Sequence, residues 1–161
     1  MFFGNDEKTI KDEGEDNMEN FHAEWAACLL EGIENNCSVK IGQACLEKCA
    51  CFHYRVNDMD RLLEKYVTDL NGFIDFLQRE YGWVIQINNE NKNIIVDENK
   101  DYCVCPITAA LHGKVSSLLC DCSAHYASKM FSKVLGKEVK AKVKRSYLRD
   151  GLSCIYEIGI E

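Results

Sequence analysis

Three pairs of cysteines have spacings that would allow their thiols to share one ligand. The pairs are Cys45-x-x-x-Cys49, Cys103-x-Cys105-Pro106 and Cys120-x-Cys122-Ser123. Thiols four residues apart lie on one face of a helix, and a Cys-x-Cys pair converges where the chain bends. Four thiolates would suit Zn²⁺ or an iron–sulfur cluster, so these six cysteines are the candidate metal ligands. None of the pairs has the Cys-x₂-Cys spacing of zinc fingers, and small buried thiols without a metal are the alternative.

The third pair could also do covalent chemistry. If Asp121 or Ser123 caps a helix, the neighbouring thiols lie where the helix dipole lowers a thiol pKa. His125 follows Cys122 by three residues and would stand one turn away, as a base or a metal ligand. The carboxylate of Asp121 works against a thiolate. The catalytic candidates are therefore Cys120, Cys122 and His125, with packed thiols and a surface histidine as the alternative.

The bulk composition limits where such chemistry would take place. The 161 residues suit one domain, and the chain has ten cysteines and a net charge of −7. No secretory signal and no long apolar run are visible, so a cytoplasmic location and no membrane partner are expected. In a reducing compartment, ten cysteines argue for metal binding or redox chemistry before disulfides. Residues 1–20 carry −5 of the charge, and nothing favours a nucleic-acid partner; the oligomeric state stays open.

Helical spacing dominates the first half of the chain. Residues 1–17 are acidic and lack an apolar period, so we expect a mobile tail before a single domain at 18–161. Helices are predicted at about 18–34, 38–52 and 58–81. The inward stripe of the first is Phe21, Trp25, Cys28, Leu29 and Ile33; that of the second is Ile41, Cys45, Cys49 and Phe52. Cys28 is thus expected to be a small buried hydrophobe, and Cys28→Ser to cost stability.

Period-2 alternation takes over in the second half. Residues 83–88 and 94–98 predict a hairpin, 101–106 an extended piece, and 107–119 a loop with one or two helical turns. A helix then ends at Gly136, and two strands follow around an Asp150-Gly151 turn. Lys140, Lys142 and Lys144 form a basic row of the kind that protects an edge strand. The order predicts an α+β fold: N-terminal helices packed on an antiparallel β-sheet, then a C-terminal helix–strand–hairpin–strand unit.

Several short motifs, taken together, resemble a known family. They are Gly42-x-x-Cys45-x-x-x-Cys49-Ala50, Cys103-Val-Cys105-Pro106, Cys120-Asp-Cys122-Ser123, Met130-Phe131, Leu135-Gly136-Lys137-Glu138-Val139 and Asp150-Gly151-x-x-Cys154-x-x-x-Ile158. As a set they resemble cysteine-rich members of the L-2-amino-thiazoline-4-carboxylic acid hydrolase-like family, over about residues 40–160. The closing strand–turn–Gly-x-x-Cys pattern more distantly resembles the 4-vinyl reductase ligand-binding domain, which has a helical layer on an antiparallel sheet.

The resemblance implies a small-molecule-binding α+β domain, some relatives of which hydrolyse a thiazoline ring to an N-carbamoyl cysteine. We therefore expect a cysteine-lined pocket between the helical layer and the sheet. In one hypothesis a thiolate or a metal-bound water opens a small cyclic C–N substrate. In the other, a non-catalytic sensor or binding module, similar to the 4-vinyl reductase domain, holds a small ligand or a metal, Zn²⁺ or an iron–sulfur cluster. A chain with buried thiols and no site is the third reading.

Overall fold

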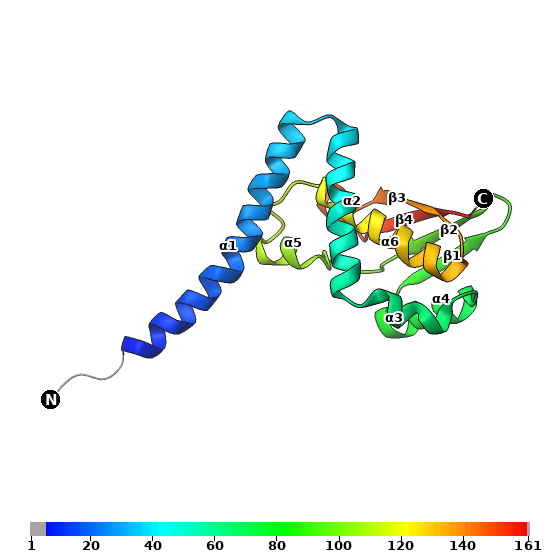
Figure 1. The fold of residues 1–161 in the computed structure, drawn as a ribbon, viewed down its shortest axis with the longest axis horizontal. Coiled ribbons are helices and arrows are strands. Elements are labelled where there is room, and N and C mark those ends of the chain that lie inside the picture. The colour runs from blue at the N-terminus through cyan, green and yellow to red at the C-terminus, as the bar shows by residue number, and fades with distance from the viewer. Residues whose placement is uncertain (1–5, 161) are drawn as a thin grey trace.

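The computed structural model describes the backbone of residues 6–160 and the side chains of residues 21–160. Seven α-helices, one 3₁₀ helix and four strands occupy this range (Figure 1). In chain order they are α1 (Asp6–Asn36), α2 (Val39–Val56), α3 (Met59–Leu63), η1 (Glu64–Tyr66), α4 (Leu70–Tyr81), β1 (Val84–Asn88), β2 (Asn93–Asp97), α5 (Pro106–Ala110), α6 (Leu119–Leu135), β3 (Lys140–Arg145), α7 (Tyr147–Asp150) and β4 (Ile155–Gly159). The predicted α+β fold is confirmed.

The four strands form an antiparallel sheet in the order β1-β2-β4-β3. Alternation along the strands turns one face inward, because successive side chains point to opposite sides. Val96 pairs with Tyr156, and Ile94 with Ile158, so the buried side chains of β2 and β4 form a continuous patch. This patch is the floor of the main hydrophobic core.

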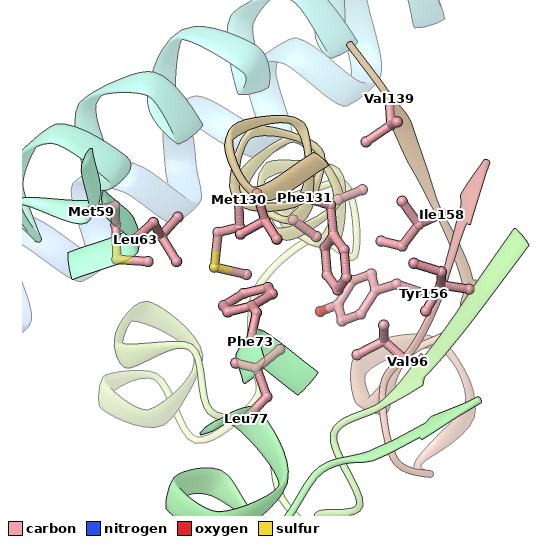
Figure 2. Packing of buried hydrophobic residues seen from close by; sticks show 14 of the residues in the cluster. Met59, Leu63, Phe73, Leu77, Val96, Met130, Phe131, Val139, Tyr156 and Ile158 are labelled. Atoms are coloured by element: carbon pink, nitrogen blue, oxygen red, sulfur yellow. The ribbon is translucent and has the colours of Figure 1, made fainter. Parts of the chain in front are cut away.

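Helix α6 lies between the sheet and α2 (Figure 1). Its buried side chains include Ala127, Met130 and Phe131. Figure 2 shows Phe131 reaching from α6 toward the sheet residue Tyr156. Gly136 ends the helix at φ 66°, in the left-handed region that glycine adopts without strain, as predicted.

Two serines of α6 hold the edge strand β3. The backbone N–H of Val139 donates to the Ser132 hydroxyl at 2.9 Å, and that of Ala141 donates to Ser128 at 2.8 Å. These bonds satisfy backbone donors that an edge strand would otherwise leave to solvent. The helix is thereby fixed along the edge of the sheet, and its first turn is positioned with it.

The single helix predicted over 58–81 is wrong. The segment forms α3, η1 and α4, with a break at Thr68, whose φ is 65°. The Asp69 carboxylate caps α4 by accepting from the Gly72 N–H at 2.9 Å. A Cβ at Gly72 would collide with that carboxylate, so this glycine belongs to a helix start, not to a helix interior. The apolar stripe continues across the break, which is why spacing alone suggested one helix.

The predicted strands are found with one change in their connection. The hairpin of residues 83–98 is present as β1 and β2. Strands β3 and β4 pair as expected, but Asp150 and Gly151 end the short helix α7 instead of forming a tight turn. Ser146 makes this possible, because its hydroxyl accepts from the Arg149 N–H and caps α7. A helical turn predicted within 107–119 is present as α5, which begins at Pro106; of the piece predicted to be extended over 101–106, residues 101 and 102 form a bend and Cys105 is extended.

Helix α1 differs from prediction at its start. It begins at Asp6, so residues 6–17, expected to be a mobile tail, are helical, while residues 1–5 lie outside the described residues. The segment is rich in Glu and Lys, which have good helix propensity without any apolar period. Lack of amphipathic spacing therefore did not mean lack of a helix.

The predicted inward faces of α1 and α2 are also wrong. On α1, Ala23 and Leu30 are buried and Cys28 is exposed. On α2 the buried residues are Gly42, Leu46, Ala50 and Tyr54, while the predicted stripe of Ile41, Cys49 and Phe52 is exposed and Cys45 half-buried. Cys28→Ser is consequently not expected to leave a hydroxyl unpaired in a core. Both helices carry apolar residues on two sides, and only one of these sides packs against the rest of the protein.

Candidate ligand-binding cavity

A cavity of about 350 Å³ lies between α6, α4, the sheet and the loop before α5. Its walls are mainly apolar, and include Met59, Phe73, Leu77, Val96, Ala127 and Met130. Figure 2 shows how α3, α4, α6 and β2 bring most of these side chains together, with Phe73 between Met130 and Leu77. The volume falls within the roughly 300–1,000 Å³ range of small-molecule sites.

Half of the cysteines of the chain line this cavity. They are Cys103, Cys105, Cys120, Cys122 and Cys154. The predicted Cys-x-Cys pairs therefore do meet at one place, together with the cysteine of the last strand. The remaining predicted pair, Cys45 and Cys49, does not join them: Cys49 is exposed, and Cys45 packs against the cluster of Leu30 and Leu46.

Burial favours the neutral form of three of the cavity thiols, Cys120, Cys122 and Cys154. Burial raises the pKa of Cys120, and raises the pKa values of Cys122 and Cys154 to about 12. The expectation of a low pKa at a helix entrance is wrong for these thiols. Cys120 and Cys122 do lie in the first turn of α6, but Leu118 at the N-cap offers no side-chain cap. Loss of solvation outweighs the helix dipole there.

His125 lies on another side of α6 from the cavity. It lines a second, polar hollow that also contains Asp121, Ser128 and Lys129. Cys122 faces the cavity, so the structure does not bring His125 and Cys122 together as base and nucleophile. The histidine that does line the cavity is His53 of α2, whose ring centroid lies 4.8 Å from that of Tyr126. In the sequence His53 stands two residues after Cys51, in a Cys-Phe-His run that gives only a weak signal for a site.

The cavity has a polar end that the sequence analysis missed. Glu98 follows β2, is 5% exposed, and accepts a hydrogen bond from the Tyr156 hydroxyl at 3.2 Å. Burial raises the pKa of Glu98, so this side chain is favoured as the neutral acid. Cys154 and Cys120 lie beside it, and both influence the Tyr156 hydroxyl electrostatically. We call Glu98, Tyr156, Cys154 and Cys120 the polar end.

Two residues that line the cavity each have an oxygen atom without a hydrogen-bond partner among the described residues. The two atoms are Oε2 of Glu98 and Oγ1 of Thr108, and both are buried. Buried polar atoms are nearly always hydrogen-bonded, since an unpaired one costs about 1–3 kcal/mol. A signal for Glu98 existed in the sequence: it continues the alternation of Ile94 and Val96 and so points inward from the same face.

The six predicted metal ligands do not converge on one point. Cys120 lies near Cys103 and Cys154, whereas Cys122 lies near Cys49 and Cys105. Over residues 21–160, no group of three or more His, Cys, Asp or Glu side chains is arranged to hold a metal ion. The side chains as placed therefore do not fit the expected zinc ion or iron–sulfur cluster, and a bound metal stays a prediction.

Alkylation rates should follow exposure and protonation state. With N-ethylmaleimide at pH 7.5, we expect the exposed thiols of Cys28, Cys37 and Cys49 to react first. Cys120 and Cys154 should react last, and quickly only in denaturant, because they are buried and their pKa values are raised. Peptide mapping of timed samples measures the order. Early modification of Cys120 in folded protein would contradict the placement of the cavity thiols.

None of the described helices is long and apolar enough to cross a lipid bilayer. Comparison of the chain with protein-family models, with curated proteins and with solved structures gave no match.

Proposed function

We propose that the protein binds a small, mainly apolar and uncharged molecule with one or two hydrogen-bonding groups. The observation that carries this proposal is an apolar cavity of about 350 Å³ with an unpartnered, buried carboxyl oxygen of Glu98 at its polar end. The apolar walls favour a hydrocarbon ring or chain, because removing such a surface from water contributes about 25 cal/mol per Å². Hydrogen bonds to the polar end would fix the orientation of the ligand in the cavity.

The charge of the cavity lining supports an uncharged ligand. Among the described residues no lysine or arginine lines it, and its acid, Glu98, is favoured in the neutral form. A ligand carboxylate would find no fixed cation in this lining, and burying an unpaired charge is costly. A neutral carboxyl group can instead donate to a carbonyl, hydroxyl or ring nitrogen of the ligand. The Thr108 hydroxyl offers a second partner.

Ligand binding is better supported than hydrolysis. A nucleophilic thiol needs a base in reach or a lowered pKa. Here the pKa values of the thiols are raised, and His125 lies at the other hollow. A thiazoline carboxylate, the substrate class that the resemblance suggests, would also bring a carboxylate into a lining whose described residues offer no fixed cation. The proposed role is that of a binding or sensor module, with the hydrolase-like reading as the rival.

Thermal shifts with simple probes test the proposal. Benzyl alcohol and 1-hexanol should raise the melting temperature in a saturable way, and glycerol and benzoate should not. A ligand at about a hundred times its Kd stabilises a protein by about 2.7 kcal/mol, which is several degrees for a domain of this size. Equal shifts by benzoate and benzyl alcohol would contradict the preference for neutral ligands. No shift by any probe would contradict the proposal itself.

A substitution that fills the cavity can be compared with the same substitution outside it. Ala127 lines the cavity and Ala44 lies on the exposed side of α2, so Ala127→Phe adds a ring inside and Ala44→Phe adds the same ring outside. We expect Ala127→Phe to abolish the benzyl alcohol shift and Ala44→Phe to keep it. Circular dichroism establishes that each variant is folded. If Ala127→Phe does not fold, Cys122→Phe, which adds a ring at another point of the cavity lining, replaces it in the comparison.

A further inference from the structure

The outer face of α1 is apolar and uncovered among the described residues. Phe21, Trp25 and Leu29 are 58%, 61% and 51% exposed, while Ala23 and Leu30 are buried on the other side of the helix. The N-terminal part of α1 projects away from the other elements (Figure 1), and the exposure of the three side chains shows that no described residue covers them. These three side chains and Cys28 together expose on the order of 400 Å², about the size of the largest apolar patch on a typical monomer, which is often functional.

The stripe has the spacing of a two-helix seam. Phe21, Trp25, Cys28 and Gly32 are separated by four, three and four residues, the alternation of a heptad repeat. The first two side chains are large and the last two are small. Gly32 is open: a Cβ built there would meet nothing within 4 Å. At the seam positions the face is therefore bulky toward the N-terminus and open toward the C-terminus, where Leu29 stands beside the seam.

We propose that a second copy of this chain covers this face, with the two α1 helices packed antiparallel. In that orientation Phe21 lies opposite the partner's Gly32, and Trp25 lies opposite the partner's Cys28. Each contact occurs twice about a two-fold axis, as in most homodimers. Large residues then fill the hollows left by small ones along the whole seam, which is the complementarity that close packing requires.

Charge selects the antiparallel arrangement over a parallel one. Residues 1–20 carry a charge of −5. Parallel helices would place the two acidic halves side by side, whereas antiparallel helices centred between Trp25 and Cys28 carry each acidic half past the end of the partner's helix. Like charges in contact oppose association, so the antiparallel pair is favoured over the parallel one, although Glu24 and Glu31 still bring like charges together along the seam and weaken the pair.

The seam is small compared with a standard interface, which buries roughly 800 Å² on each partner. The stripe supplies about half of that area, and flanking polar side chains of the two helices would form the rim. We therefore expect a reversible dimer with a Kd in the micromolar range, not a permanent one. A protein that remains monomeric at concentrations well above this Kd would be inconsistent with the proposal.

Sedimentation equilibrium of the full chain between about 1 and 200 μM, a range that brackets a micromolar Kd, tests the assembly. We expect a monomer–dimer equilibrium for the natural sequence. Gly32→Phe should weaken it at least tenfold, although the added ring meets open space in the single chain. Glu34→Phe puts the same ring on an exposed position of the same helix that points away from the seam, and should leave the equilibrium unchanged. Equal effects of the two substitutions would overturn the seam.

A size swap identifies the register. Because Gly32 is proposed to face the partner's Phe21, adding Phe21→Ala to Gly32→Phe should restore dimerisation. Failure of this rescue, with both variants folded by circular dichroism, would overturn the antiparallel register. A natural chain that stays monomeric at the highest concentration would overturn the proposal as a whole and leave the face to another partner.

Discussion

Replacing Phe131 with alanine is expected to lower the free energy of unfolding by about 3–5 kcal/mol, the usual range for a fully buried phenylalanine. Phe131 is 0% exposed and sits where α6 meets the sheet. Its ring makes an edge-to-face contact with Phe73 at a centroid distance of 5.3 Å. The same ring lines the cavity, so its removal enlarges a space that the surrounding rigid elements cannot close.

Chemical denaturation with guanidinium chloride measures the loss, and the chain offers a matched control. Phe52 on α2 is 60% exposed, so Phe52→Ala deletes the same ring from a surface position and should cost less than about 1 kcal/mol. Similar losses for the two variants would mean that Phe131 is not at the centre of the core as the structure places it.

The second large effect is a dependence of stability on pH that comes from Glu98. Burial raises the pKa of Glu98 in the folded protein, and each unit of difference from the unfolded value corresponds to about 1.4 kcal/mol. A raised folded pKa means that the stabilising contribution is fully present below the unfolded pKa. That contribution is lost as the pH rises through the folded pKa. The melting temperature should therefore fall as the pH rises above the ordinary carboxyl pKa of 4.5 and through the raised pKa of Glu98 in the folded protein.

Glu98→Gln removes the ionisation and keeps the shape of the side chain. The variant should lose most of this pH dependence and should be more stable than the natural protein at pH 8. Glu90→Gln serves as the control, because Glu90 is exposed and should leave the slope as it is. Thermal melts of the three proteins at several pH values measure the effect. A natural protein whose melting temperature does not fall in this window would contradict a neutral, buried Glu98.

Local patterns predicted the elements that local chemistry determines. Alternation marked both hairpin partners at residues 83–98, and Gly136 marked the end of α6, because a left-handed residue is needed there. The break at Thr68 could not be predicted in the same way. The apolar stripe continues through the break. The features that separate α4 from the preceding helix are the Asp69 side chain, which caps the start of α4, and its close approach to Gly72.

The site was predictable in its position but not in its chemistry. Spacing correctly suggested that Cys103, Cys105, Cys120 and Cys122 gather at one place. It could not show that burial would raise the thiol pKa values, because the depth of a side chain depends on the packing of distant segments. For the same reason sequence alone did not decide which apolar side of α1 or α2 meets the body.

Fluorescence of Trp83 tests the cavity most directly. The chain has two tryptophans, and Trp25→Phe leaves Trp83, which lines the cavity, as the only one. Titration with 4-bromobenzyl alcohol should quench this signal along a saturable binding curve, because a bound bromine atom would lie near the indole ring. Adding Ala127→Phe should remove the saturable part. Quenching that rises linearly with concentration, and equally in both proteins, would contradict a ligand-binding cavity.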